Sequence, residues 1–298
     1  MSTTAASSET TFEKTYFDRT FRFAKLDPAH DVVDARRLKE LGADSVSVSV
    51  ADPTCTNIED VDLLKGVSGI RALRLNAYSY KSVAGMSACT SLEYLSFTGV
   101  SNGAVPFAAC TALWCAYLNY DPKTCEAIFE AKTLEHAFVD NYVGKSSKPF
   151  ESFRNARRLG LMKNRLAELD AVQAMPKLEH LGFGYNSTMK SIGWLSHHAS
   201  LSSVGFNNCK NISDWNVLAT LSNLEVVLLE SCGEIATLDF IHQLPRVKEL
   251  RLVGNTRVKD ARIASLLKHP TLKHIFVPVR KDYDVTLSEL TAFNQALR

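Results

Sequence analysis

An apolar pattern recurs along most of the chain at nearly constant spacing, and it constrains the fold more than any other feature. In each copy an apolar residue is followed at +3 and +5 by two more, as in Leu178, Leu181 and Phe183. A regular period of this length predicts an array of small structural repeats that bury their apolar residues against one another. The first positions of the successive copies, 21 to 25 residues apart, are Ile70, Leu92, Leu113, Leu134, Ala156, Leu178, Leu201, Leu224, Val247 and Leu272.

The place three residues after the third apolar position indicates how each copy continues. In the later copies this place holds Asn164, Asn186, Cys209, Cys232 and Asn255. Such side chains can satisfy backbone groups where the chain turns away from a strand. The earlier copies have other residues there, so we expect the N-terminal half to curve or pack differently. Those residues are Tyr78, Val100, Asp121 and Tyr142.

The pattern resembles that of the leucine-rich-repeat superfamily, L-x-x-L-x-L-x-x-N/C-x-L with a period of roughly 20 to 29 residues. The resemblance covers residues 45–280, and the short period is similar to that of the internalin-like class. It implies an α/β fold: a leucine-rich-repeat solenoid, or curved horseshoe. Its parallel β-sheet would form the concave face, and short helices or 3₁₀ turns would form the convex face.

A solenoid needs caps at both ends, because its terminal repeats would otherwise expose their core. We expect a disordered tail over residues 1–11 and an N-terminal cap over 12–44, in which an aromatic cluster suggests a strand or hairpin and a helix runs from Asp27-Pro28 to Gly42. About ten to eleven repeats would fill 45–280. Apolar residues at helical spacing predict a C-terminal capping helix within 281–298.

Composition and charge argue against several classes of partner and location. The chain has 34 basic and 32 acidic residues, a net charge of +2, which disfavours nucleic acid. No apolar run approaches the roughly 18 residues of a membrane span, and Met1–Thr11 lacks the features of a secretory signal. Seven cysteines without paired spacing indicate reduced thiols. We therefore expect a cytoplasmic protein, and favour a monomer.

Strand alternation puts the residues at +2, +4 and +6 of each copy on the open concave face. An aromatic patch beside an arginine and a run of glycines stand out there, and aromatic and arginine side chains are typical of binding hot spots. We expect Tyr117 and Phe138 to point to solvent. Alternatively, the aromatics merely favour strands and the glycines accommodate neighbouring rings. The candidate partner-binding residues are Tyr94, Tyr117, Phe138, Asp140, Arg158, Gly160, His180 and Gly182.

The sequence contains no phosphate-binding loop, dinucleotide fingerprint, zinc-protease motif or nucleophile elbow. We expect no enzymatic activity, no cofactor and no metal. Cys89 and Cys110 occupy equivalent places in adjacent copies, and would form a buried thiol ladder or, alternatively, a redox pair. An enzyme with a site improvised on the concave face would use His136, Asp140 and His180.

These observations favour a non-enzymatic module that binds a protein partner on its concave face. The habits of the resembling family suggest a stoichiometric inhibitor or immunity-type protein. The alternative is an adaptor or regulatory subunit that targets another enzyme, although no recruitment domain is visible. The resemblance also allows a secreted adhesin, against which the absence of a signal peptide and surface anchor argues.

Overall fold

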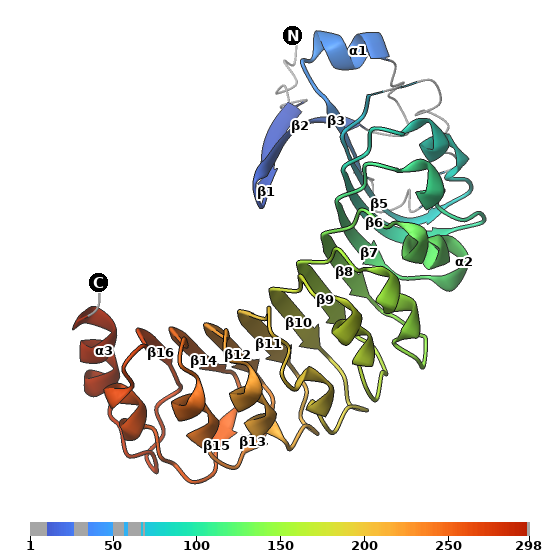
Figure 1. The fold of residues 1–298 in the computed structure, drawn as a ribbon. Helices are drawn as coiled ribbons and strands as arrows, with labels where there is room; N and C mark the ends of the chain where they lie inside the picture. Colours follow the sequence, from blue (N-terminus) through green and yellow to red (C-terminus); the bar gives the residue numbers. More distant parts are fainter. Residues whose placement is uncertain (1–10, 27–34, 50–56, 59–66, 68, 297–298) are drawn as a thin grey trace. The chain divides into compact units, whose positions relative to one another are not determined.

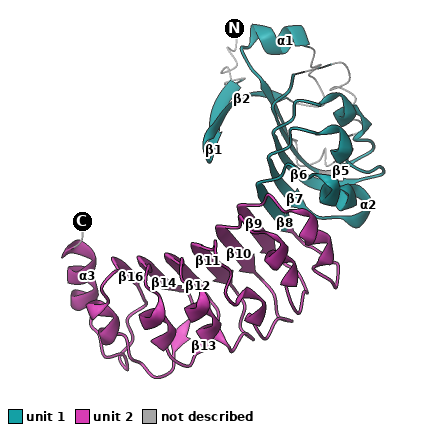
Figure 2. Cartoon of the chain, in the orientation of Figure 1, with its two compact units in different colours: residues 1–139 teal, residues 140–298 magenta. Residues whose placement is uncertain are grey.

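The computed structural model describes residues 11–26, 35–49, 57–58, 67 and 69–296. The chain divides into two compact units, residues 1–139 and 140–298 (Figure 2). The continuous repeat pattern does not predict this division. Most of the tail expected over residues 1–11 lies outside the described residues, but Thr11 already belongs to the first strand.

Unit 1 contains a sheet of mostly parallel strands that begins with an antiparallel hairpin of β1 and β2 (Figure 1). The strands follow in the order β1-β2-β3-β5-β6-β7-β8, with β4 beside β5. Their bounds are β1 (Thr11–Tyr16), β2 (Arg19–Leu26), β3 (Ser45–Ser49), β4 (Asn57–Ile58), β5 (Ala72–Tyr80), β6 (Tyr94–Ser101), β7 (Cys115–Asn119) and β8 (His136–Asp140), the last ending at the unit boundary.

Unit 2 contains parallel strands in the order β9-β10-β11-β12-β14-β16 and a small second sheet of β13 and β15. Each main strand is one repeat further along the chain than its neighbour. The bounds are β9 (Arg158–Met162), β10 (His180–Gly184), β11 (Ser203–Asn207), β12 (Val226–Glu230), β13 (Glu234–Ile235), β14 (Glu249–Val253), β15 (Arg257–Val258) and β16 (His274–Phe276).

Short helices, most of them 3₁₀, connect the strands. None of the helices in the described part of the chain has the length and apolar character needed to cross a membrane. The helices are α1 (Ala35–Glu40), η2 (Ala84–Ala88), η3 (Phe107–Ala109), α2 (Pro122–Cys125), η4 (Glu126–Glu130), η5 (Lys148–Ser152), η6 (Asp170–Ala174), η7 (Gly193–Leu195), η8 (Trp215–Thr220), η9 (Asp239–Gln243), η10 (Ala264–Lys268) and α3 (Leu287–Ala296). Parallel strands alternating with short helices confirm the leucine-rich-repeat fold.

The three apolar positions of every repeat are buried, and none of their side chains is more than 9% exposed. The strands pair in the predicted register, so that Leu181 lies opposite Leu159 on one side and Val204 on the other. In the N-terminal half, Ala72, Tyr94 and Cys115 are in register as expected. The apolar pattern therefore predicted both the core and the alignment of the strands.

Buried polar side chains satisfy the turns after the strands, with one difference from expectation. Asn186 is fully buried; it donates to Asn164 Oδ1 (2.8 Å) and accepts the backbone N–H of Met189 (2.8 Å). Asn255 was expected to act in the same way, but it is exposed. Thr256 takes its place, is 1% exposed, and donates to the carbonyl of Leu229 (2.9 Å). The turn contains an additional residue around Gly254, which has a φ of +63°.

The two ends of the described array are closed by different devices. At the C-terminal end, Asn294 of α3 accepts the N–H of Ile275 (2.9 Å) and donates to its carbonyl (3.0 Å). Thr286 and Glu289 form a reciprocal capping box at the start of the same helix. At the N-terminal end, α1 ends before Gly42, which has a φ of +60°; the expected helix start at Asp27-Pro28 lies outside the described residues.

Replacing Leu181 by alanine tests the register of the core. Because this side chain is 2% exposed, we expect Leu181→Ala to lower the free energy of unfolding by about 2–5 kcal/mol. Leu287→Ala is the matched control, since Leu287 is 68% exposed and its truncation should change stability by less than about 0.5 kcal/mol. Urea denaturation measures both, and equal effects would show that the register is wrong.

Candidate functional site

Strand alternation in unit 1 places three aromatic residues of the candidate site in a row. Tyr94, Tyr117 and Phe138 come from β6, β7 and β8. The rings of Tyr117 and Phe138 are stacked with centroids 4.2 Å apart, and those of Tyr94 and Tyr117 are 5.9 Å apart. They lie on the face formed by the +2, +4 and +6 residues, here called the column face. The predicted aromatic patch therefore exists.

The expectation that this patch is open to solvent is wrong, because the N-terminal hairpin covers it. Tyr16 stacks on Tyr94 with centroids 4.0 Å apart, and Tyr94 is only 3% exposed. Phe17 stacks at 6.2 Å on Phe138, which is partly buried like Tyr117. Alternation predicts the face on which a side chain lies, but not which segment packs over it.

The hairpin gives unit 1 a second apolar core on the column face. Phe21 and Phe23 of β2 are fully buried and pack in one cluster with Tyr94, Trp114 and Cys115. Burial, together with the side-chain hydrogen bond to Tyr16, raises the pKa of Tyr94 above its ordinary value. The three aromatic candidates are thus partly or wholly used in holding the hairpin.

An ion-pair network runs along the edge of this second core. Glu93 accepts from Arg19 Nη1 (2.6 Å) and from Arg71 Nε (2.7 Å), and Arg71 also pairs with Asp44 (3.0 Å). Burial by itself would raise the pKa of Glu93, but the hydrogen bonds from Arg71 and Arg19 outweigh it and lower that pKa. The carboxylate is therefore ionised at neutral pH and ties the hairpin to the repeats.

In unit 2, the glycines of the candidate site form a row across three strands. Gly160, Gly182 and Gly205 are direct partners in the parallel pairing of β9, β10 and β11. Arg158 and His180 are also paired with each other on the same face. The structure thus brings four of the candidate residues together: Arg158, Gly160, His180 and Gly182.

The surroundings of the glycines differ in an informative way. A Cβ atom at Gly182 would meet nothing closer than Met162 Cε at 3.8 Å, and one at Gly205 nothing closer than Leu228 Cδ2 at 3.7 Å. These are ordinary van der Waals distances. At Gly184, by contrast, a Cβ would approach Met162 Sδ to 2.7 Å and Asn207 O to 2.9 Å. Internal packing requires glycine at 184 but not at 182 or 205.

The titratable candidates in unit 2 are half-buried. Burial, followed by the charge of Arg158, lowers the pKa of His180, so its imidazole is neutral at pH 7. Burial raises the pKa of Asp140, although the nearby charge of Lys163 opposes this. His180 can therefore donate or accept a hydrogen bond without carrying a charge.

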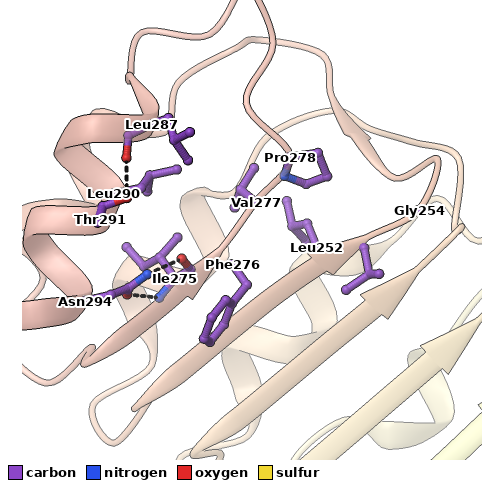
Figure 3. Close-up of a pocket in the computed structure, with 11 residues that line it drawn as sticks. Leu252, Gly254, Ile275, Phe276, Val277, Pro278, Leu287, Leu290, Thr291 and Asn294 are labelled. Carbon is purple, nitrogen blue, oxygen red and sulfur yellow. Dashed lines mark hydrogen bonds between the residues drawn. The ribbon is translucent and has the colours of Figure 1, made fainter. Parts of the chain in front are cut away.

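An apolar pocket that the sequence did not predict lies at the C-terminal end of unit 2. It has a volume of about 390 Å³ and lies between the strands β14 and β16 and the helix α3 (Figure 3). Val253, Phe276 and Leu287 line it and are 39%, 45% and 68% exposed. Val253 is at +6 of the copy that begins at Val247, and Phe276 is at +4 of the copy that begins at Leu272. Alternation therefore places both on the column face, which is the signal for the pocket that the sequence offers.

The geometry gives little support to an improvised enzyme. His136 and Asp140 are four residues apart on β8, which separates them by roughly 13 Å along the strand. His136 is 6% exposed and lies stacked under Phe17 at 4.0 Å. No group of three His, Cys, Asp or Glu side chains that could hold a metal occurs within the described ranges.

The described cysteines are buried thiols. Burial raises the pKa to about 11 for Cys89 and Cys232 and to about 12 for Cys110 and Cys209. All six cysteines in the described ranges are free and buried. A thiol with so high a pKa is a poor nucleophile, which favours the thiol ladder over the redox pair.

Comparisons with known proteins place the fold. No family model matches the chain, and no curated protein matches it either. Among solved structures, it is similar to an internalin, InlF from Listeria monocytogenes, with 18% identity, a TM-score of 0.51, and coverage of 88% of this chain and 69% of that one. The internalin InlC2 of the same organism shares 21% identity with a TM-score of 0.51, over 66% of this chain and 84% of that one.

A vertebrate structure is similar to the same degree. The mouse RP105/MD-1 complex gives a TM-score of 0.52 at 12% identity; 85% of this chain is covered, but only 44% of the matching chain. At such identities the likeness shows the leucine-rich-repeat fold alone.

Glu93→Gln tests the ion-pair network. The folded-state pKa of Glu93 is lowered, so its contribution to stability is present at neutral pH and is lost as the pH falls through that pKa. We expect the variant to lose about 1 kcal/mol at pH 7 and less at pH 3. Urea denaturation at both pH values measures this. Glu13→Gln is the control, since Glu13 is exposed and 3.8 Å from Arg22, and a pH-independent loss at Glu93 would contradict the assignment.

Thiol labelling tests the cysteine assignment. In a Cys55→Ser background, which removes the cysteine outside the described residues, we expect no reaction with a soluble thiol reagent at pH 7 within minutes. Full labelling should follow in denaturant. Rapid labelling of the folded protein at Cys89 or Cys110 would instead revive the redox pair.

Proposed function

We propose that this leucine-rich-repeat protein is a binding module for another protein, and that the column face of unit 2 carries the contact. The glycine row of Gly160, Gly182 and Gly205 is the observation that supports this most directly. Glycine weakens a strand interior, and internal packing leaves room for a side chain at 182 and 205. Close approach by a second molecule is a physical reason to keep these positions bare.

The residues around the glycine row supply the chemistry for such a contact. His180 offers a neutral imidazole beside the guanidinium of Arg158. Val226 and Leu228, both half-buried, follow on the next strand in the register of Ser203 and Gly205. A bare backbone flanked by an arginine on one side and aliphatic groups on the other suits the side chains of a protein partner, since interfaces combine apolar anchors with a few polar contacts.

The proposal extends to the role and the location of the protein. The inhibitor or immunity-type role comes from the habits of proteins with this fold, and an adaptor that targets an enzyme uses the same surface. Cytoplasmic location rests on the odd number of cysteines without paired spacing. The two roles differ in what happens to the partner: an inhibitor abolishes the partner's own activity, whereas an adaptor leaves it intact.

Filling the glycine row tests the binding surface. We expect Gly182→Leu with Gly205→Leu to abolish capture of the partner from host lysate, because two bulky side chains would hold the partner away from the strands. Thermal unfolding should change little. Affinity capture read by mass spectrometry measures the loss.

Asn216→Leu is the matched control. It adds an exposed leucine on η8, outside the sheet, and should retain the partner. Full capture by the double glycine variant would rule out this surface.

A further inference from the structure

The hairpin of unit 1 has a base and a tip that are held in different ways. At the base, Phe21 and Phe23 are fully buried, and β2 pairs in parallel with β3 through Phe23 and Ser45. The tip, Tyr16 to Arg19, reaches over the column face, where the side chain of Phe17 is 40% exposed and Asp18 is exposed. The base belongs to the fold, whereas the tip lies on a surface.

The residue at the turn is unusual for its position. Phe17 has a φ of +56°, a left-handed conformation that glycine or asparagine adopts far more readily than an aromatic residue. The ring of Phe17 stacks at 4.0 Å on His136 and meets Trp114 edge-on at 5.8 Å. A strained backbone persists only where surrounding contacts compensate for it. The contacts of the Phe17 ring are the compensation found here.

A second anchor lies two residues further on. The Arg19 guanidinium is 4.2 Å from the centroid of the Trp114 ring, and its Nη1 is 2.6 Å from Glu93 Oε2. We call Glu93, Trp114, His136 and Phe138 together the aromatic cradle. The aromatic cradle therefore contacts two side chains at a fixed spacing. An aromatic ring lies between His136, Phe138 and Trp114, and an arginine lies between Trp114 and Glu93.

We propose that the aromatic cradle is a recognition site for a turn of a partner protein that carries an aromatic residue two positions before an arginine. The chain's own tip is the resident occupant and competes with that partner. Aromatic and arginine side chains are the anchors that protein interfaces most often use. The site lies in unit 1 and does not depend on the binding surface proposed for unit 2.

Competition by a tethered tip has a measurable consequence. A segment joined to its site is present at an effective concentration of about a millimolar. The apparent affinity for a free turn equals the intrinsic affinity multiplied by the fraction of molecules in which the tip has left the cradle. Removing the anchors of the tip should therefore strengthen binding of an added turn while the base of the hairpin stays folded. A tip that the fold requires would instead unfold the base when its anchors are removed.

The test uses the full chain and a labelled peptide, a disulfide-closed loop with the sequence of residues 14–20. We expect the Phe17→Gly, Arg19→Ser variant to bind this peptide at least about tenfold more tightly than the wild type. Lys14→Ala, at an exposed position on β1, is the control and should behave as the wild type. Fluorescence anisotropy measures the affinities.

Specificity is tested on both sides of the contact. Two variant peptides should fail to bind. In one, alanine replaces the residue equivalent to Phe17, and in the other, glutamine replaces the residue equivalent to Arg19. Adding Phe138→Ala to the tip variant should abolish binding as well. Equal binding to all proteins, or no binding to a folded tip variant, would overturn the proposal.

Hydrogen exchange shows whether the hairpin stays folded when its tip is altered. The amides of Phe21 to Leu26 should stay protected in the tip variant, and Arg19→Ser alone should give a smaller gain in peptide binding. Loss of protection at the base in both variants would show that the tip is structural and overturn the proposal. Dimerisation of the wild type that the tip variant abolishes would replace the foreign partner by a second copy of this chain.

Discussion

Burial of three apolar side chains per repeat against the neighbouring repeats is the interaction on which the rest of the structure depends. A repeat that offers three apolar side chains, two of them on its strand, cannot exclude water alone, so each repeat needs the next one. Leu181, between Leu159 and Val204, illustrates this arrangement. The same requirement fixes the register, because a slip by one residue would turn the apolar set outward. The strands that carry the column face are therefore aligned by contacts made on the opposite side of the sheet.

The sequence predicted what depends on periodicity and missed what depends on long-range contact. The core triplets, the strand register and the turn role of Asn164 and Asn186 follow from spacing and from the need to satisfy buried backbone groups. The misplaced turn residue, Thr256 instead of Asn255, arises because one long repeat contains an additional residue. No local rule predicts such a shift from a single sequence.

The candidate site shows the same division. Alternation correctly placed Tyr94, Tyr117 and Phe138 on one face and Gly160 beside Gly182. It could not show that Tyr16 and Phe17 pack over those rings, since both residues lie more than 70 positions before Tyr94 in the sequence. Exposure on a sheet face depends on every segment that can reach it. Aromatic clusters near the end of a repeat array are thus ambiguous between a binding surface and the seat of a cap.

The hydrogen bonds of Asn294 have a consequence for how such an array can change in length. Its amide group meets the N–H and the carbonyl of Ile275, and so takes the part that another strand would play. These hydrogen bonds are made to the backbone of the last strand and not to its side chains. A repeat could therefore be gained or lost upstream while the same C-terminal helix still fits, so that the length of the column face can vary without a new terminal cap.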